Sequence, residues 1–424
     1  MNMKRTMVVA STLAISLMVA AGCSSSSKSS TSSTASSTSG GGSGTTVTTA
    51  AGTATTATAT GSTWVLGSIV TETGPESPST GGAGAVLNAW QNWVNTHGGI
   101  NGHRVKVIVK DDKGDPTQGL AAAHELIQSD HVIALVGTAS TPENQWGPYV
   151  SQAGVPVIGT GATSGIIWMT NPDFYPVGTS PLSETYAFLL AASKAGKPKM
   201  ALLYCAESPA CAQAVPFTKK LAPSVGVTVV YAGSVSTTQP NYSAQCLAAQ
   251  SAGANSLNVA ADQNTVTRTV SDCTRQGVKM TLLGGDGTVS AAWVTNPNFQ
   301  GEVDWQPYIP WNQHNAATAD YYAAMAQYAP AELHDPRFGA NDIGSWISGQ
   351  LFIAAAKAAN LGDNPTAAQV VTGLTSLHNE TLGGLTTPLT FAQGVPHVNK
   401  CFFLESIQNK QWTQPYGTQP FCQP

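Results

Sequence analysis

From residue 64 onward, short apolar runs alternate with segments whose apolar residues recur at helical spacing. The apolar runs of strand length fall into two sets: residues 64–70, 104–110, 132–137 and 155–159, then 200–204, 227–231, 256–260 and 280–283. The main helical segments between them are residues 84–95, 116–128, 184–193 and 265–276. This alternation is typical of parallel sheets covered by helices. Two sets, each of domain size, predict an α/β protein with two doubly wound lobes.

The later part of the chain predicts that the two lobes exchange segments. Residues 318–327 and 343–360 return to helical spacing, and we assign them to the first lobe. A segment around 389–405 then crosses back to finish the second lobe. We therefore expect lobe 1 to comprise 64–180 and 315–385, and lobe 2 to comprise 181–314 and 386–424. Three strands of chain would join the two lobes as a hinge.

The N-terminal residues predict export. Lys4 and Arg5 precede an apolar stretch, residues 7–21, which has the length of a signal-peptide core and is too short to span a bilayer. The stretch ends in Ala20-Ala21-Gly22-Cys23, which resembles a bacterial lipobox with Ala20 where leucine is usual. We expect a signal peptide over 1–22 and a lipid on Cys23. The alternative is an ordinary cleaved signal followed by a chance cysteine.

Residues 23–63 predict a disordered tether behind that cysteine. After Cys23 they are nearly all Ser, Thr, Gly and Ala, with Lys28 as a charged exception, and cannot bury an apolar face. Random-coil scaling gives such a linker a reach of about 35 Å. We expect the folded part to stand off the extracellular face of the membrane. A glycosylated or wall-crossing stalk is compatible with the same composition.

Composition narrows the partners and the redox state. Charged residues make up 10% of the chain and the net charge is −4, which argues against nucleic acid as a partner. Beside Cys23 there are six cysteines, an even number that favours three disulfides in an oxidising compartment. Fifteen pairings are possible. We favour Cys205–Cys211 within one loop, Cys246–Cys273 between successive helices, and Cys401–Cys422 near the C-terminus. A metal site is disfavoured because no CxxC spacing or histidine cluster is present.

Loops that follow the predicted strands carry the candidate ligand contacts, because ligands of open parallel sheets bind at the carboxyl ends of the strands. The candidates are hydroxyls and glycines after the third and fourth strands, and acids after the seventh and eighth: Ser140, Thr141, Gly161, Thr163, Asp262 and Asp286. Hydroxyls beside a helix N-terminus suit a carboxylate, whereas an acid suits an ammonium group. Helix capping and turn formation are the structural alternatives for these residues.

Two motifs around the second predicted strand resemble a known signature. The run Gly98-Gly99-Ile100-Asn101-Gly102-His103 precedes it, and Asp111-Asp112-Lys113-Gly114-Asp115-Pro116 follows it. Together they resemble the signature of type I solute-binding proteins of ABC importers, of the branched-chain amino acid type, with His103 where arginine is usual. The resemblance implies the type I periplasmic binding protein fold, no enzymatic activity and no cofactor. It also implies a small-molecule solute and an importer permease as partners, and we expect a monomer.

The resemblance also implies roles for individual residues. A ligand carboxylate would be held by Thr141 with the Ala139 backbone, and by Gly161 with Thr163. Asp286 would meet the ligand ammonium, where amino acid binders often carry glutamate. The loops 205–211 and 262–264 lack the aromatic residues usual there, so an amide, a urea-like compound or a hydroxylated acid is an alternative ligand to an aliphatic amino acid.

The sequence offers further cleft candidates and motifs of other activities. The loop 71–75, residues 80–82, Trp146 and Trp311 are further cleft candidates, although large aromatics more often pack in a core. Residues 284–288 read GGDGT, a phosphate-binding motif of lipid and NAD kinases, but an exported protein has no ATP supply. No G-x-S-x-G elbow of a hydrolase is present. The alternative that stays open is a receptor of the same fold that signals to a membrane partner.

Overall fold

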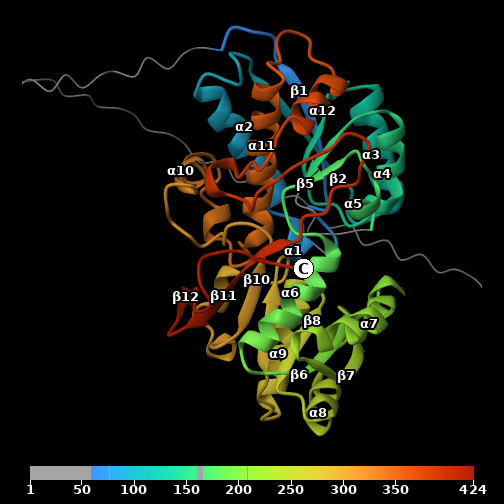
Figure 1. Ribbon diagram of the computed structural model, residues 1–424, viewed down its shortest axis with the longest axis vertical. Helices are drawn as coiled ribbons and strands as arrows, with labels where there is room; N and C mark the ends of the chain where they lie inside the picture. Colours follow the sequence, from blue (N-terminus) through green and yellow to red (C-terminus); the bar gives the residue numbers. More distant parts are fainter. Residues whose placement is uncertain (1–58, 76, 160–165, 208) are drawn as a thin grey trace, which may run out of the picture. The chain divides into compact units, whose positions relative to one another are not determined.

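The computed structural model describes residues 59–75, 77–159, 166–207 and 209–424 (Figure 1). Two sheets organise this part of the chain. The first has the strand order β2-β1-β3-β4-β5 and is parallel throughout. Its strands are β1 (Trp64–Val70), β2 (Val105–Asp111), β3 (Leu135–Thr138), β4 (Val157–Gly159) and β5 (Phe174–Pro176). The helices between them are α1 (Ser77–Thr80), α2 (Ala83–Thr96), α3 (Pro116–Gln128), α4 (Glu143–Gln152) and α5 (Ile167–Thr170).

Helices cover both faces of the first sheet. On one face α2 packs with three helices from late in the chain, α10 (Ala319–Tyr328), α11 (Ala340–Ala358) and α12 (Ala367–Thr375), around a core that includes Trp90 and Trp346 (Figure 1). On the other face α3, α4 and α5 enclose a second core that includes Trp146 and Trp168. Helix α3 begins where it does because the Asp115 carboxylate accepts from the N–H groups of Thr117 and Gln118 and Pro116 occupies the first turn.

The second sheet has the order β12-β11-β10-β9-β8-β6-β7, with β13 paired to β11. Strands β6 to β10 are parallel, whereas β11 and β12 add an antiparallel edge. The strands are β6 (Lys199–Cys205), β7 (Thr228–Val235), β8 (Ser256–Ala260), β9 (Thr281–Gly285), β10 (Val303–Gln306), β11 (Cys401–Gln408), β12 (Gln411–Thr413) and β13 (Phe421–Cys422). Their helices are α6 (Pro181–Lys194), α7 (Pro209–Leu221), α8 (Ser243–Ser251) and α9 (Gln263–Arg275). One core lies against α8 and α9, and another against α6.

Short 3-10 turns complete the chain: η1 (Ala222–Val225), η2 (Ala291–Trp293), η3 (Pro297–Phe299), η4 (Glu332–His334) and η5 (Leu382–Gly384). Within the described ranges, no helix combines the length and the apolar character needed to cross a bilayer.

The chain passes between the two sheets three times, and the passages are bonded to one another. The Ser180 N–H donates to Asn399 O (2.8 Å), and Ile309 N–H donates to Leu385 O (3.0 Å). The Thr386 hydroxyl donates to Val177 O (2.9 Å). The expected α/β fold with two parallel sheets is therefore confirmed, and the passages lie side by side as a hinge requires.

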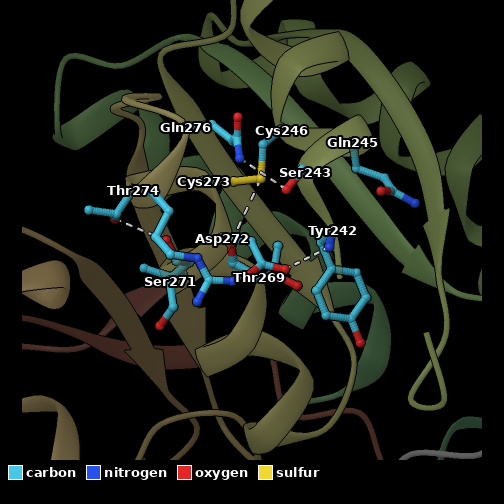
Figure 2. Close-up of a disulfide and its surroundings, with 12 residues drawn as sticks. Tyr242, Ser243, Gln245, Cys246, Thr269, Ser271, Asp272, Cys273, Thr274 and Gln276 are labelled. Atoms are coloured by element: carbon cyan, nitrogen blue, oxygen red, sulfur yellow. Dashed lines mark hydrogen bonds and ion pairs between the residues drawn. A yellow bond between two sulfur atoms is a disulfide. The ribbon is translucent and has the colours of Figure 1, made fainter. Parts of the chain in front are cut away.

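The six described cysteines form Cys205–Cys211, Cys246–Cys273 and Cys401–Cys422, the pairing favoured from the sequence. Figure 2 shows the second of these joining α8 to α9. Beside it, the Tyr242 backbone N–H donates to Asp272 Oδ2 (2.7 Å). This hydrogen bond and the disulfide together join the two helices (Figure 2).

Some elements differ from the sequence expectation. Strands β5 and β10, of three and four residues, were not predicted. The equally short β3 and β4 lie in longer apolar runs, whereas β10 alternates Val303 and Trp305 with the polar Asp304 and Gln306, and β5 directly follows Pro172 and Asp173. The late segment 389–405, for which no type of element was predicted, forms strand β11 only from Cys401, since Gly394 and Pro396 interrupt the earlier part. Helix α11 begins at Ala340, three residues before the expected start, because the Asp342 carboxylate accepts from the Gly339 N–H.

Candidate functional site

At the carboxyl edge of the first sheet, a buried network joins three strand ends. The Asp112 carboxylate, after β2, accepts from the Thr71 hydroxyl after β1 (2.7 Å) and from the Ser140 hydroxyl after β3. The Trp146 indole N–H in turn donates to Ser140 Oγ (2.8 Å). Thr71, Asp112 and Ser140 are fully buried. These hydrogen bonds hold the three strand ends together, and they engage the Ser140 hydroxyl within the protein.

Thr141, directly after Ser140, reaches the surface at this edge. Its side chain is exposed, its N–H donates to Thr71 Oγ1 (3.1 Å), and its hydroxyl lies 3.4 Å from the same oxygen. The neighbouring Ala139 has both backbone groups engaged: its N–H donates to Ile69 O (3.2 Å) and its carbonyl accepts from Thr71 N (2.9 Å). In this structure the Thr141 hydroxyl is therefore better placed than the Ala139 backbone to meet a ligand.

At the carboxyl edge of the second sheet, Asp262 follows β8 and caps α9. Its Oδ1 accepts from the N–H groups of Asn264 (2.9 Å) and Thr265 (3.2 Å), whereas its buried Oδ2 has no hydrogen-bond partner. Helix capping accounts for Asp262 Oδ1, and Oδ2 remains able to accept a hydrogen bond.

Asp286 follows β9, the strand next to β8 in the same sheet. It is 7% exposed, its Oδ1 accepts from the Tyr308 hydroxyl (3.4 Å), and its Oδ2 has no partner. The turn depends on glycine: Gly287 has φ +75°, and a Cβ at Gly285 would lie 1.9 Å from Trp305 Nε1. The glycines thus let the chain turn sharply and leave Asp286 at the strand end.

The two edges meet at Ser79 of α1. The Gln263 N–H donates to Ser79 Oγ (3.3 Å), and Asn341 Nδ2, at the start of α11, donates to Ser79 O. The Gln263 side chain also donates to Val289 O (3.0 Å), in the loop that follows Asp286. The buried Asn341 Oδ1 has no partner. Buried acceptor oxygens without a donor thus occur on Asn341, on Asp262 next to Gln263, and on Asp286 in the loop that Gln263 contacts at Val289.

Burial makes this region electrostatically unusual. It raises the pKa of Asp286 to about 7, although hydrogen bonds from Tyr308 and from the Gly287 backbone act in the opposite direction. Burial, and then the nearby charge of Asp286, raises the pKa of Glu184 in the first turn of α6 to about 8. Two acids that are this reluctant to ionise side by side would be stabilised by a cationic group between them.

Other sequence-predicted positions lie elsewhere or outside the described residues. Gly161, Thr163 and Cys23 fall outside them. In the loop closed by Cys205–Cys211, Glu207 is exposed and accepts from Thr237 N (2.7 Å) and the Ser236 hydroxyl (2.8 Å). This carboxylate caps a local turn rather than facing Asp286.

The two tryptophans considered for the cleft wall are core residues. Trp146 is fully buried and stacks on Phe174 at 6.1 Å between ring centroids. Trp311 is 5% exposed and meets the rings of Phe338 and Trp412 edge-on.

The arrangement is suited to binding. Over the described part of the chain, no group of three or more His, Cys, Asp or Glu side chains is placed to hold a metal ion. The profile of a family described as periplasmic binding protein matches residues 63–411. The chain belongs to the periplasmic binding protein family. Members of this family bind solutes and are not enzymes, which agrees with the expectation from the sequence.

Solved structures share the fold of this periplasmic binding protein. A substrate-binding protein of an ABC transporter from Aeropyrum pernix superposes with a TM-score of 0.72 at 16% identity, over 85% of this chain and 96% of that one. A solute-binding protein from R. palustris in complex with benzoate gives 0.69 at 16% identity, over 83% and 95%. An amino acid binding protein of Pseudomonas aeruginosa is 33% identical over 75 residues, which span 17% of this chain and 19% of that relative.

Tyr308, Asn341, Ser79 and Glu184 were not identified from the sequence. Tyr308 follows the unpredicted strand β10, and its one hydroxyl proton is shared between Ala340 O (2.8 Å), beside Asn341, and Asp286 Oδ1 (3.4 Å). Of the four, only Ser79 lies near a predicted cleft segment, residues 80–82. The others come from distant parts of the chain, so no local pattern marks them.

Proposed function

We propose that this periplasmic binding protein captures a small polar solute that carries an amine, such as an amino acid or a related amide or carboxylate, and delivers it to an ABC importer. One observation carries the proposal: Asp286 is buried at the carboxyl edge of the second sheet with one carboxylate oxygen lacking any donor. A buried carboxylate is costly unless paired, and a ligand ammonium would supply the missing charge and donors.

The surroundings of Asp286 support this ligand class. Asp262 Oδ2 and Asn341 Oδ1 are further buried acceptors without donors, and acceptors select a ligand rich in N–H groups. The amino acid binding protein of Pseudomonas aeruginosa, similar over 75 residues, agrees with an amine-bearing solute. The benzoate complex of the R. palustris protein agrees with a carboxylate at the other end of the ligand.

For that other end, we propose the Thr141 hydroxyl together with Gly161 and Thr163. The exposed Thr141 side chain lies at the carboxyl edge of the first sheet, just before α4. Hydroxyls and free N–H groups at such a place suit a carboxylate. Gly161 and Thr163 follow from the family resemblance and lie outside the described residues.

We further propose that the two lobes, 64–180 with 315–385 and 181–314 with 386–424, close on the solute about the three passages between the sheets. Hinge closure of this kind brings groups from two lobes onto one ligand. The protein would act as a monomer on the extracellular face of the membrane, held by a lipid on Cys23 and the linker behind it. Labelling with a radioactive fatty acid should mark the wild type but not Cys23→Ser.

A ligand screen tests the binding function. Thermal shifts should be measured with amino acids, amides, urea-like compounds, hydroxylated and aromatic acids, polyamines and sugars. A bound solute at a hundred times its Kd should stabilise the fold by about 2.7 kcal/mol. We expect amine-bearing solutes to raise the melting temperature. The proposal fails if only amine-free compounds do so.

Asp286→Asn then tests the site. We expect this variant to weaken an amine-bearing ligand at least about tenfold in calorimetry, because a charge-assisted hydrogen bond contributes about 1.5–3 kcal/mol. Asp320→Asn, an exposed acid on α10, is the matched control and should bind as the wild type does. Equal affinity of Asp286→Asn and Asp320→Asn would remove Asp286 from the site.

The alternative is a receptor of the same fold that signals to a membrane partner. Uptake of the radiolabelled solute by cells with and without the gene separates the two. Loss of uptake on deletion, restored by the wild type and not by Asp286→Asn, is the result expected of an importer. Unchanged uptake would favour the sensing role.

A further inference from the structure

Three acids lie buried together on strands β10 and β11, away from the proposed ligand contacts. Asp304 of β10 stands directly opposite Glu405 of β11 in the antiparallel register, and Glu302 immediately precedes β10. Glu302 is 1% exposed, and Asp304 and Glu405 are fully buried. Like charges directly opposite each other in a sheet destabilise it. Three ionised carboxylates would therefore be strongly unfavourable here.

Each acid has one oxygen with a donor and one without. Glu302 Oε1 accepts from Ile407 N (3.2 Å), Asp304 Oδ2 from Gln306 Nε2 (2.6 Å), and Glu405 Oε2 from Asn312 Nδ2 (2.8 Å). Glu302 Oε2, Asp304 Oδ1 and Glu405 Oε1 have no partner. The fully buried Gln306 has an amide oxygen that also lacks a donor, while its amide nitrogen points at Asp304. The cluster thus holds four buried acceptors and is short of donors.

Among the described residues, Lys197 and Lys279 line the same cavity as Glu302, and neither forms an ion pair with it. Among the ion pairs of the described residues, none includes Glu302, Asp304 or Glu405. The other ionisable groups that interact with the cluster are phenols: Tyr322 of α10 beside Glu405, and Tyr416 beside Glu302.

Helix α6 also packs on β10 and β11, and its ionisable groups are engaged elsewhere. Glu184 interacts with Asp286, Lys194 lies over the Phe421 ring, and the Tyr186 ring packs edge-on against Phe402. The carboxyl groups can supply donors themselves in their protonated form.

We propose that β10 and β11 form a proton-binding site, in which Asp304 and Glu405 share a proton and Glu302 is held neutral. The carboxyl O–H groups supply donors to the facing carboxylate and to the Gln306 amide oxygen. The site ties together two strands that continue into the passages between the sheets, since Asn312 lies in one passage and β11 begins at the end of another. Protons therefore stabilise the second sheet where it joins those passages.

The direction of the pH dependence follows from burial. Burial raises the pKa of Asp304 to about 6, and burial with the charge of Asp304 raises the pKa of Glu302 and of Glu405 further. The folded chain therefore holds protons that the unfolded chain releases. The stabilisation is complete below the ordinary carboxyl pKa and is lost as the pH rises through the raised values.

Unfolding by urea at a series of pH values between about pH 4 and pH 8 tests the proposal, with the full chain throughout. Each proton held only by the folded state changes the unfolding constant about tenfold per pH unit. The double variant Asp304→Asn, Glu405→Gln puts amide donors in place of these two carboxyl groups and leaves Glu302 as the titrating acid of the site. We expect the unfolding constant of this variant to change less steeply with pH than that of the wild type, by at least about a factor of ten per pH unit. Asp320→Asn, the exposed control, should keep that slope.

Equal slopes in the wild type and the double variant would overturn the proposal. If the double variant does not fold, the pH slope of the unfolding constant is measured for Glu302→Gln instead. A slope equal to that of the wild type would show that Glu302 holds no proton in the folded state. Above the ordinary carboxyl pKa, the folded wild type should also show more infrared absorption from protonated carboxyl groups than the double variant, and equal absorption would contradict the proposal. If calcium raised the melting temperature of the wild type but not of the variants, the site would be a metal-binding site and not a proton-binding site.

Discussion

The pH dependence of solute affinity is the prediction that the geometry of Asp286 makes most sharply. An ammonium group binds the ionised carboxylate, so any proton on Asp286 must leave before the ligand binds. With a pKa of about 7 in the unliganded protein, the carboxylate is ionised in about 1% of molecules at pH 5. It is ionised in about half of the molecules at pH 7, so affinity should fall about fiftyfold between pH 7 and pH 5, or about 2.3 kcal/mol at 1.36 kcal/mol per pH unit.

Calorimetric titration of an amine-bearing ligand from the thermal-shift screen measures this directly. Repeating each titration in buffers of different ionisation enthalpy should reveal about one proton released per ligand at pH 5 to 6. Asp286→Asn should flatten the profile and release no proton. Affinity that is constant over this range, or that rises as the pH falls, would refute the assignment of Asp286 to the ligand ammonium.

The remaining predictions concern the frame around the site. Replacing Cys246 and Cys273 by serine should lower the free energy of unfolding by about 3.5 kcal/mol, the loop-entropy value for a separation of 27 residues, as measured by urea unfolding. A loss below about 1 kcal/mol would mean that the bond from Tyr242 N to Asp272 already holds α8 against α9. Ser140→Ala should cost about 1–3 kcal/mol, because it leaves an Asp112 oxygen and the Trp146 indole without partners. Thr141→Val at the exposed neighbouring position should leave stability within about 0.5 kcal/mol and weaken a carboxylate ligand instead; the opposite pattern would place the ligand contact on Ser140.

Much of the fold was predictable from the sequence because its parallel strands are short apolar runs between helices of clear period. The segments 64–70, 116–128 and 256–260 coincide with β1, α3 and β8. Strands β5 and β10 were missed because, unlike the equally short β3 and β4, they do not lie in longer apolar runs. The sequence likewise did not predict where the antiparallel strands β11 and β12 begin after the irregular segment that precedes them.

The family signature marks structural positions more than ligand contacts. His103 is buried and stacks on Trp64 at 4.8 Å between ring centroids. The Asn101 side chain donates to the carbonyls of Ala356 (3.2 Å) and Leu361 (3.1 Å), at the far end of α11. Asp112 holds the buried network of the first sheet edge. These residues identify the fold because they fix its turns, and they leave the ligand unspecified.

The candidate site was predictable only in part. Asp262 and Asp286 could be placed because each follows a predicted strand, and strand ends of one sheet meet at one edge. Asn341 could not, since its contact with Ser79 spans 262 residues of sequence and no local pattern encodes it. The shortage of donors among three acids on β10 and β11 was equally hidden, because it arises only when the two strands pair.

The central claim is that the unpaired carboxylate of Asp286 recognises a ligand amine. Titrating the wild type at about pH 7.5, where this carboxylate is largely ionised, with an amine-bearing ligand and with its des-amino analogue tests that claim directly. We predict that the analogue binds at least about tenfold more weakly, and that Asp286→Asn removes the difference. Equal affinity of the two compounds for the wild type would contradict the account.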